Sequence, residues 1–193
     1  METDNSSRNE ALLVAEARKG EERAWRQLVS QHQDAVFRLA YLITGSAEEA
    51  QDVAQDAFVR AYLKLDQYDD GRPLRPWLLG ITGNLARNRR RSIGRYWHAV
   101  QRFLHERGEQ TVVAPPRDNS DAQLLWQAVQ KLPRAAQAVI YLRYFLELSE
   151  AETAETLDIA PGTVKSRAHR SLKKLRLIIE YEYPELADER TIS

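Results

Sequence analysis

Apolar residues recur along this 193-residue chain at the three-to-four-residue spacing of amphipathic helices, and no segment shows the sustained alternation of a strand. Alanine, leucine, arginine and glutamate dominate the composition and favour the same state. The pattern therefore predicts an all-α chain. The predicted helices cover residues 11–29 (one helix, or two that break near Gly20), 33–44, 46–65, 76–91, 121–132, 134–146, 149–157 and 162–180.

Local signals place several helix starts independently of the apolar spacing. Ser46 with Glu49, and Ser149 with Glu152, have the spacing of capping boxes, in which a serine hydroxyl and a glutamate carboxylate satisfy backbone N–H groups of the first turn. Pro76 suits the first turn of the next helix, because its missing N–H costs nothing there. These signals predict helices that begin close to residues 46, 76 and 149.

The helical pattern weakens between residues 92 and 120. The segment TVVAPPRDNSD has paired prolines and turn formers without periodicity, as expected of a linker. We therefore expect two small helical domains, residues 1–93 and 121–180, joined by a flexible linker at 94–120. Residues 181–193 are expected to form a frayed tail.

The composition limits the cellular compartments in which the protein is expected. The chain has no cysteine, which excludes disulfides and thiolate chemistry and is compatible with a reducing cytoplasm. No run of about 18 apolar residues is present to span a membrane, and the first residues, METDNSSRNE, lack the apolar core of a signal peptide. We expect a cytoplasmic protein with no membrane insertion.

Charge is neutral in sum, with 28 basic and 28 acidic residues, but it is arranged in blocks. Acids dominate residues 44–70, and arginines dominate residues 81–107. The order repeats in the second half, where residues 144–160 carry acids without a base and residues 161–176 carry bases without an acid. The two predicted domains thus share one design, an acidic block followed by a basic block.

Residues 148–176 have the pattern of a helix-turn-helix, with the segment DIAPG as the turn. Spacings of four, four, three and four predict the buried side of the second helix: Val164, Ala168, Leu172, Leu175 and Ile179. The other side is polar and basic, and such side chains reach base edges and phosphates in the major groove. An ordinary solvated face would mix both signs of charge. The predicted DNA-reading residues are Lys165, Ser166, Arg167, His169, Arg170 and Lys173.

The polar side of the helix at residues 46–65 is acidic, with Glu48, Glu49, Asp52 and Asp56 crowded together. Three interpretations stay open for it. Paired carboxylates can bind a metal or exchange protons, but no group of histidines supports them here. The other two are a solvated face and a docking surface for a basic partner.

The helix at residues 76–91 predicts a different surface. Its apolar stripe contains Leu74, Leu78, Ile81 and Leu85, and beside it lies a strip formed by Trp77, Asn84, Arg87, Asn88 and Arg91. Aromatic, amide and guanidinium groups on one strip suit single-stranded nucleic acid, since rings stack bases and arginines hold the backbone. A core position is the alternative for Trp77. Gly80 and Gly83 weaken this helix by about 1 kcal/mol each relative to alanine.

Three segments together resemble bacterial RNA polymerase sigma factors of the extracytoplasmic-function class, in the sigma-70 family, over about residues 24–176. AEEAQDVAQDAFVRAYLKL is similar to the family's core-binding helix, and RPWLLGITGNLARNRRR to its promoter-melting helix. The segment from LPRAAQAVIYLRYF to SRAHRSLKKLR is similar to its C-terminal DNA-binding region. The resemblance implies a promoter-specificity subunit without catalysis, metal or cofactor.

The resemblance also implies partners. Core RNA polymerase would bind through the β′ clamp helices and the β subunit, promoter DNA would bind at the −10 and −35 elements, and an anti-sigma protein would hold the factor inactive. An extruded −10 base would lie against the loop at residues 68–75. The implied contacts are Asp52, Gln55, Asp56 and Phe58 for polymerase; Trp77, Asn84, Arg87, Asn88 and Arg91 for the −10 element; and the six residues of the second helix above for the −35 element.

Two departures from the family pattern concern packing. Glu147 stands where the family often has glycine, and Thr153 where it usually has isoleucine. Two other functions compete with the sigma-factor interpretation. One is a stand-alone helix-turn-helix regulator that binds operator DNA as a dimer, and the other is a metal-dependent nuclease built on Asp52 and Asp56.

Overall fold

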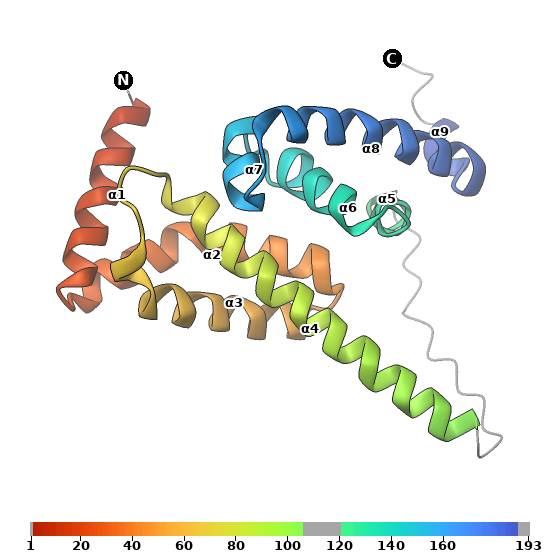
Figure 1. Ribbon diagram of the computed structural model, residues 1–193, viewed down its shortest axis with the longest axis horizontal. Coiled ribbons are helices and arrows are strands. Elements are labelled where there is room, and N and C mark those ends of the chain that lie inside the picture. The colour runs from red at the N-terminus through yellow and green to blue at the C-terminus, as the bar shows by residue number, and fades with distance from the viewer. Residues whose placement is uncertain (1, 106–120, 189–193) are drawn as a thin grey trace. The chain divides into compact units, whose positions relative to one another are not determined.

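The computed structural model describes residues 2–105 and 121–188, and these residues are helical with no strand among them (Figure 1). The all-α prediction is therefore confirmed. The chain divides into two compact units, residues 1–92 with 155–158 and residues 93–154 with 159–193. The first holds α1 to α3 and the start of α4, and the second holds most of the helices from α5 onward. Each unit is described by itself.

The first unit is built from α1 (Glu2–Arg18), α2 (Glu22–Thr44), α3 (Ala47–Leu63), the short 3₁₀ helix η1 (Leu65–Gln67) and α4 (Leu74–His105). The long α2 packs against both α1 and α3, as the ribbon shows (Figure 1). Its core draws apolar side chains from all five elements. The most deeply buried include Val14, Leu28, Val36, Ala61 and Leu74.

Helix α2 is continuous where the apolar spacing predicts two helices. The prediction of a gap between residues 29 and 33 is wrong because a polar residue, His32, occupies a buried position there and interrupts the apolar pattern. Its ring nitrogen Nε2 lies 3.1 Å from a carboxylate oxygen of Glu10. The predicted break near Gly20 is confirmed, since Gly20 has a φ of +88° between α1 and α2.

The capping box at Ser46 is half formed. The Ser46 hydroxyl accepts a hydrogen bond from the Glu49 N–H at 3.3 Å, so α3 begins where the sequence predicts. The Glu49 carboxylate instead forms an ion pair with Arg89 of α4. The box at Ser149 is complete, with distances of 2.8 and 3.1 Å for its two bonds to Glu152.

Helix α4 continues to His105, well past its predicted end near residue 91. The sequence between these points contains no proline and a single glycine, so nothing in it ends a helix. The first part of the predicted linker, residues 94–105, is therefore helical. Its remainder, residues 106–120, lies outside the described residues.

The second unit contains α5 (Asp121–Gln130), α6 (Arg134–Ile140), a π-helical turn η2 (Tyr141–Phe145), α7 (Glu150–Leu157), α8 (Pro161–Glu182) and the short α9 (Glu185–Asp188). Helix α8 packs against both α5 and α6. The buried Gln137 amide donates to the carbonyls of Gln130 and Leu132 at 2.8 Å, which satisfies the end of α5. Central core residues include Val139, Tyr141, Leu148 and Val164.

Helix continues past residue 180, where the sequence predicts the start of a frayed tail. Helix α8 reaches Glu182, and Tyr183 is 8% exposed. Lys131 contacts this segment, because it forms an ion pair with Glu182 and places its ammonium 5.2 Å from the centre of the Tyr183 ring. Residues 189–193 lie outside the described residues.

The turn at the end of η2 explains why the family often has glycine at the position of Glu147. The Leu146 N–H bonds to the Tyr141 carbonyl at 3.0 Å, and the Leu148 N–H bonds to the Leu142 carbonyl at 2.9 Å. This closing turn leaves Glu147 in the left-handed region, with a φ of +58°. Glycine adopts that conformation without a Cβ penalty, whereas glutamate does not.

Replacing Glu147 by glycine should therefore stabilise the second unit. The left-handed conformation costs a residue with a Cβ about 1–2 kcal/mol, and glycine's extra freedom in the unfolded chain offsets part of the gain. We expect about 1 kcal/mol more free energy of unfolding in urea titrations. Asp158→Gly is the control, because Asp158 has a φ of +53° but aspartate tolerates it better, so its gain should be smaller. A less stable Glu147→Gly variant would contradict the explanation.

Thr153, the other departure, is fully buried, and its hydroxyl has no hydrogen-bond partner within residues 2–105 and 121–188. Valine has nearly the same shape without the polar group, so Thr153→Val should raise the free energy of unfolding by about 1 kcal/mol. Thr82→Val is the matched control, since Thr82 is equally buried but its hydroxyl donates to the Leu78 carbonyl at 2.8 Å. Thermal unfolding that ranks the two variants the other way would refute this assignment.

Candidate functional site

The helix-turn-helix predicted from the sequence is formed by α7, a turn and α8. Asp158 is in the left-handed region, and the Ile159 N–H bonds to the Ala154 carbonyl at 3.0 Å, which closes the turn. Pro161 then occupies the first turn of α8. Val164 and Ala168 are buried, which fixes the rotation of α8 about its axis.

This rotation exposes the predicted DNA-reading residues along α8. Five of them are exposed and Arg167 is half-buried. Two contacts order the face locally: the Ser166 hydroxyl donates to the Thr163 carbonyl and Arg170 Nε donates to the Ser166 carbonyl, both at 3.2 Å. The exposed five are Lys165, Ser166, His169, Arg170 and Lys173.

One position of the predicted buried side of α8 is wrong. Leu172 is 41% exposed, and Ser171 is buried in its place. The Ser171 hydroxyl donates to the Arg167 carbonyl at 2.7 Å, so its burial leaves no hydroxyl unsatisfied. The spacing of apolar residues cannot predict that this serine is buried, because the carbonyl that accepts its hydrogen bond lies in the same helix.

The charge of this face is not neutralised. Among the described residues, no acid forms an ion pair with the cations between Lys165 and Lys174, and the first ion pair along α8 is Arg176 with Glu180 at 3.1 Å. A row of unpaired cations on one helix face attracts phosphates and releases their counterions. We call the five exposed residues and Arg167 the α8 face.

The acidic side of α3 is exposed, as the sequence predicts for Asp52, Gln55 and Asp56. Arg89 of α4 spans part of it, with ion pairs to Glu49 and, at 2.9 Å, to Asp52. Within residues 2–105 and 121–188 no group of three or more histidine, aspartate or glutamate side chains could hold a metal ion.

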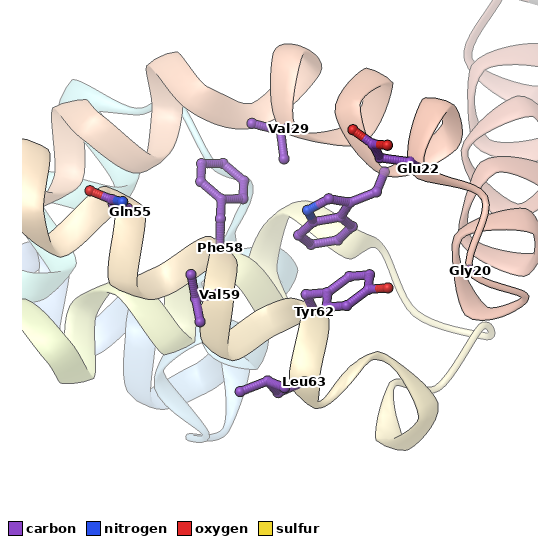
Figure 2. Close-up of a pocket in the computed structure, with 9 residues that line it drawn as sticks. Gly20, Glu22, Val29, Gln55, Phe58, Val59, Tyr62 and Leu63 are labelled. Carbon is purple, nitrogen blue, oxygen red and sulfur yellow. The ribbon is translucent and has the colours of Figure 1, made fainter.

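An apolar groove of about 660 Å³ lies beside the acidic side, between α2 and α3 (Figure 2). Val29 of α2 and Phe58 of α3 point toward one another across it. The Phe58 ring packs edge-on against Trp25 at 6.3 Å, and Tyr62 lies 5.2 Å from Trp25. The lining residues are Gly20, Glu22, Trp25, Val29, Gln55, Phe58, Val59, Tyr62 and Leu63.

The groove contains two predicted polymerase contacts, Gln55 and Phe58, and adds residues that sequence reasoning missed. Val59, Tyr62 and Leu63 are 56%, 46% and 75% exposed, which is unusual for apolar side chains that lie together. Their spacing from Gln55 marks a second apolar side of α3, distinct from the buried stripe that includes Ala57. This second apolar periodicity is the sequence signal that could have predicted the groove.

The strip on α4 is mostly exposed. Asn84, Asn88 and Arg91 are exposed, and Arg87 is half-buried with its Nη2 donating to Asn84 Oδ1 at 2.6 Å. Burial, and after it the charge of Arg91, lowers the pKa of Arg87. An anion placed here would relieve the repulsion between the two guanidinium groups.

Trp77 combines a core contact with partial exposure. It packs against the core of the first unit and remains half-exposed. Its ring lies 5.0 Å from the Tyr68 ring at an angle of 47°. A Cβ at Gly83 would lie 3.2 Å from Arg87 Nη1, so a larger residue there would require the end of the Arg87 side chain to shift slightly. Gly80 has no structural explanation.

Comparison with known proteins agrees with the two-part arrangement. The family model "Sigma-70 region 2" matches residues 28–96, and "Sigma-70, region 4" matches residues 122–175. The chain is 32% identical to the ECF RNA polymerase sigma factor SigW of Bacillus subtilis, over 84% of this chain and 92% of that protein. It is 33% identical to the ECF RNA polymerase sigma factor SigL of Mycobacterium tuberculosis, over 86% and 95%.

Two solved structures are similar to this chain in fold. CnrH, solved in complex with the cytosolic domain of CnrY, is similar with a TM-score of 0.69 and 26% identity, over 90% of this chain and 99% of that one. The sigma factor RpoE of Bartonella quintana, at 22% identity and a TM-score of 0.58 over 81% of this chain and 97% of that one, shares the fold.

Across the described part of the chain, no helix combines the length and hydropathy that crossing a membrane requires.

Proposed function

Because the chain belongs to the extracytoplasmic-function class of sigma-70 family RNA polymerase sigma factors, we propose that it directs core RNA polymerase to promoters with two separate elements and helps to open them. The observation that carries this proposal is that one chain presents two different cationic surfaces, the α8 face and the α4 strip. The α8 face suits duplex DNA, and the α4 strip suits a single strand. A sigma factor of this kind acts in the cytoplasm and performs no catalysis itself.

The α8 face reads the −35 element. Helix α8 presents polar and basic side chains that suit base edges, with His169 and Arg170 at the centre of the face. The cations around them form no ion pair with any acid in the described part of the chain. Its N-terminal half follows directly after the turn, which is how a recognition helix enters the major groove. The phosphate contacts come from Lys165, Arg167 and Lys173.

The α4 strip opens the −10 element and holds its single strand. Trp77 offers a half-exposed ring for stacking, and Asn84 and Asn88 offer amides to base edges. Arg87 and Arg91 neutralise the strand's phosphates. An extruded base lies against the loop at residues 68–75, next to the paired rings of Tyr68 and Trp77.

Core polymerase docks on α3. Asp52 and Asp56 supply exposed negative charge, and the adjacent groove supplies the apolar area, with Phe58 as its edge-packed aromatic anchor. A partner helix with a basic side and an apolar side fits this surface. The β′ clamp helices are the partner that the family resemblance implies, with the β subunit as a further contact.

An anti-sigma protein holds the factor inactive until it is needed. The support is that CnrH, similar over 90% of this chain, was solved with the cytosolic domain of CnrY, and that the RpoE structure includes the anti-sigma factor NepR. The exposed apolar groove on α3 gives such a protein a surface to cover.

Reconstitution tests the proposed function. Core RNA polymerase is incubated with the protein and a pool of DNA fragments in which the promoter region is random, and transcripts are sequenced. We expect transcripts only when both proteins are present, from fragments that share two short sequence blocks. Transcription that is unchanged by the protein, together with tight duplex binding by the protein alone at physiological salt, would favour a stand-alone regulator.

A further inference from the structure

Arg18, the last residue of α1, holds the segment that leads into α4. Its Nε donates to the Leu65 carbonyl at 3.0 Å, its Nη1 pairs with the Asp70 carboxylate at 2.7 Å, and its Nη2 donates to the Tyr68 carbonyl. One guanidinium thus contacts three residues within a stretch of six. The side chain is 23% exposed, so these bonds are partly shielded from water.

Glu10, two turns earlier on α1, holds the other end of the same segment. One carboxylate oxygen accepts the N–H of Leu74, the first residue of α4, at 3.3 Å, and the other lies 3.1 Å from His32 Nε2. Burial acts to raise the pKa of Glu10, but the His32 hydrogen bond and charge and the Leu74 N–H outweigh it, so the pKa is lowered. Glu10 is therefore a carboxylate at the start of α4, where the helix dipole favours one.

Between these two anchors the loop is held by its own contacts. The Tyr68 hydroxyl donates to the Arg72 carbonyl, and the Asp69 carboxylate accepts the Gly71 N–H at 3.0 Å. Tyr68 is 7% exposed, and its ring supports Trp77. A change in the loop's position therefore changes the position of the Trp77 ring.

Arg18 also neutralises part of the negative charge of the loop. Asp69 and Asp70 would repel the phosphates of a strand that lies against the loop. Arg18 pairs with Asp70, and Arg72 pairs with Asp69 at 3.3 Å, so both carboxylates are partly neutralised within the unit. Both anchors, Glu10 and Arg18, precede residue 28, where the match to the region 2 family model begins.

We propose that α1 is a positioning element for −10 recognition, in which Arg18 and Glu10 hold the loop at residues 68–74 in the shape that receives an extruded base. This inference rests on the proposed function of the α4 strip. Arg18 is a positioning residue, because it acts through the Tyr68–Trp77 pair and the loop backbone. Its loss affects strand opening and base choice while polymerase docking, carried by α3, is retained.

The test uses holoenzyme assembled from core polymerase and the full chain, on a promoter selected with the unaltered protein. In Arg18→Ala we expect open-complex formation, followed by 2-aminopurine fluorescence in the −10 element, to slow at least tenfold, with polymerase affinity unchanged within twofold. Arg18→Lys keeps the charge near Asp70 but loses the planar fork, so it should recover part of the rate. Arg26→Ala, an exposed arginine on α2, is the matched control and should behave as wild type.

A second readout separates positioning from general stability. On a promoter made single-stranded in advance over the −10 element, Arg18→Ala should lose discrimination among the four bases at the extruded position. Hydrogen exchange should accelerate in residues 69–74 and not in α3. If circular dichroism shows that Arg18→Ala is unfolded, the opening rate and base discrimination of Arg18→Lys and Asp70→Asn are compared with wild type instead.

The failures are distinguishable. If the wild-type holoenzyme opens no promoter, the proposed function fails. If wild type opens it and the Arg18 variants match wild type in rate and base discrimination, the positioning role is overturned. A loss of opening that is matched by an equal loss of polymerase affinity also overturns it, because α1 would then support the whole unit rather than the loop.

Discussion

The double substitution Asp52→Arg with Asp56→Arg should lower the affinity for core RNA polymerase at least a hundredfold. Both carboxylates are exposed beside the apolar groove, so reversal places like charges against a basic partner, which costs several kcal/mol. A hundredfold corresponds to about 2.7 kcal/mol. The measurement is a titration of labelled protein with core polymerase at fixed salt.

The fold should survive this change. Neither side chain contributes to the core, and the one described contact that is lost is the pair of Asp52 with Arg89, whose partner Glu49 remains. Glu16→Arg with Asp34→Arg is the matched control, with the same change of charge at exposed positions on α1 and α2. An α3 variant that keeps wild-type affinity would show that polymerase docks elsewhere.

Replacing both Asn84 and Asn88 by alanine should slow opening of the −10 element at least tenfold. Each amide that reads a base edge contributes about 1–3 kcal/mol of discrimination, and alanine cannot replace it. Both residues are exposed and alanine is the better helix former, but the change also removes the hydrogen bond from Arg87 Nη2 to Asn84 Oδ1, so the stability of the unit is measured alongside. The 2-aminopurine assay on wild-type and variant holoenzymes measures the rate.

Two exposed amides on another helix give the comparison for that experiment. Gln31→Ala with Gln33→Ala on α2 removes the same chemistry away from the α4 strip and should leave opening unchanged. If the asparagine variant opens the promoter at the wild-type rate, the strip does not contact the single strand. Equal slowing in both variants would point to stability instead.

Features that depend on neighbouring residues in sequence were predictable. The capping serines, the turn before α8 and the exposure of the basic and amide side chains all follow from local chemistry and helical spacing. Two of the errors came where a polar residue takes a buried position. His32 does so by pairing with Glu10, and Ser171 by bonding within its own helix.

Features that depend on distant residues could not be read from the pattern. The groove between α2 and α3 needs Trp25 and Tyr62, which are 37 positions apart in the printed sequence, to meet. Arg18 reaches a carboxylate 52 residues away, and spacing gives no sign of such a contact. The same holds for Arg89, whose partners Glu49 and Asp52 convert part of a predicted capping box into a link between two helices.

The central claim is that two surfaces of one chain read two different promoter elements. Promoter selection from a random pool tests it most directly when it is repeated with Asn84→Ala and with His169→Ala holoenzymes. The account predicts that His169→Ala changes the selected upstream block alone, and that Asn84→Ala changes the block nearest the transcription start alone. Variants that both alter one block, or that alter neither, would contradict it.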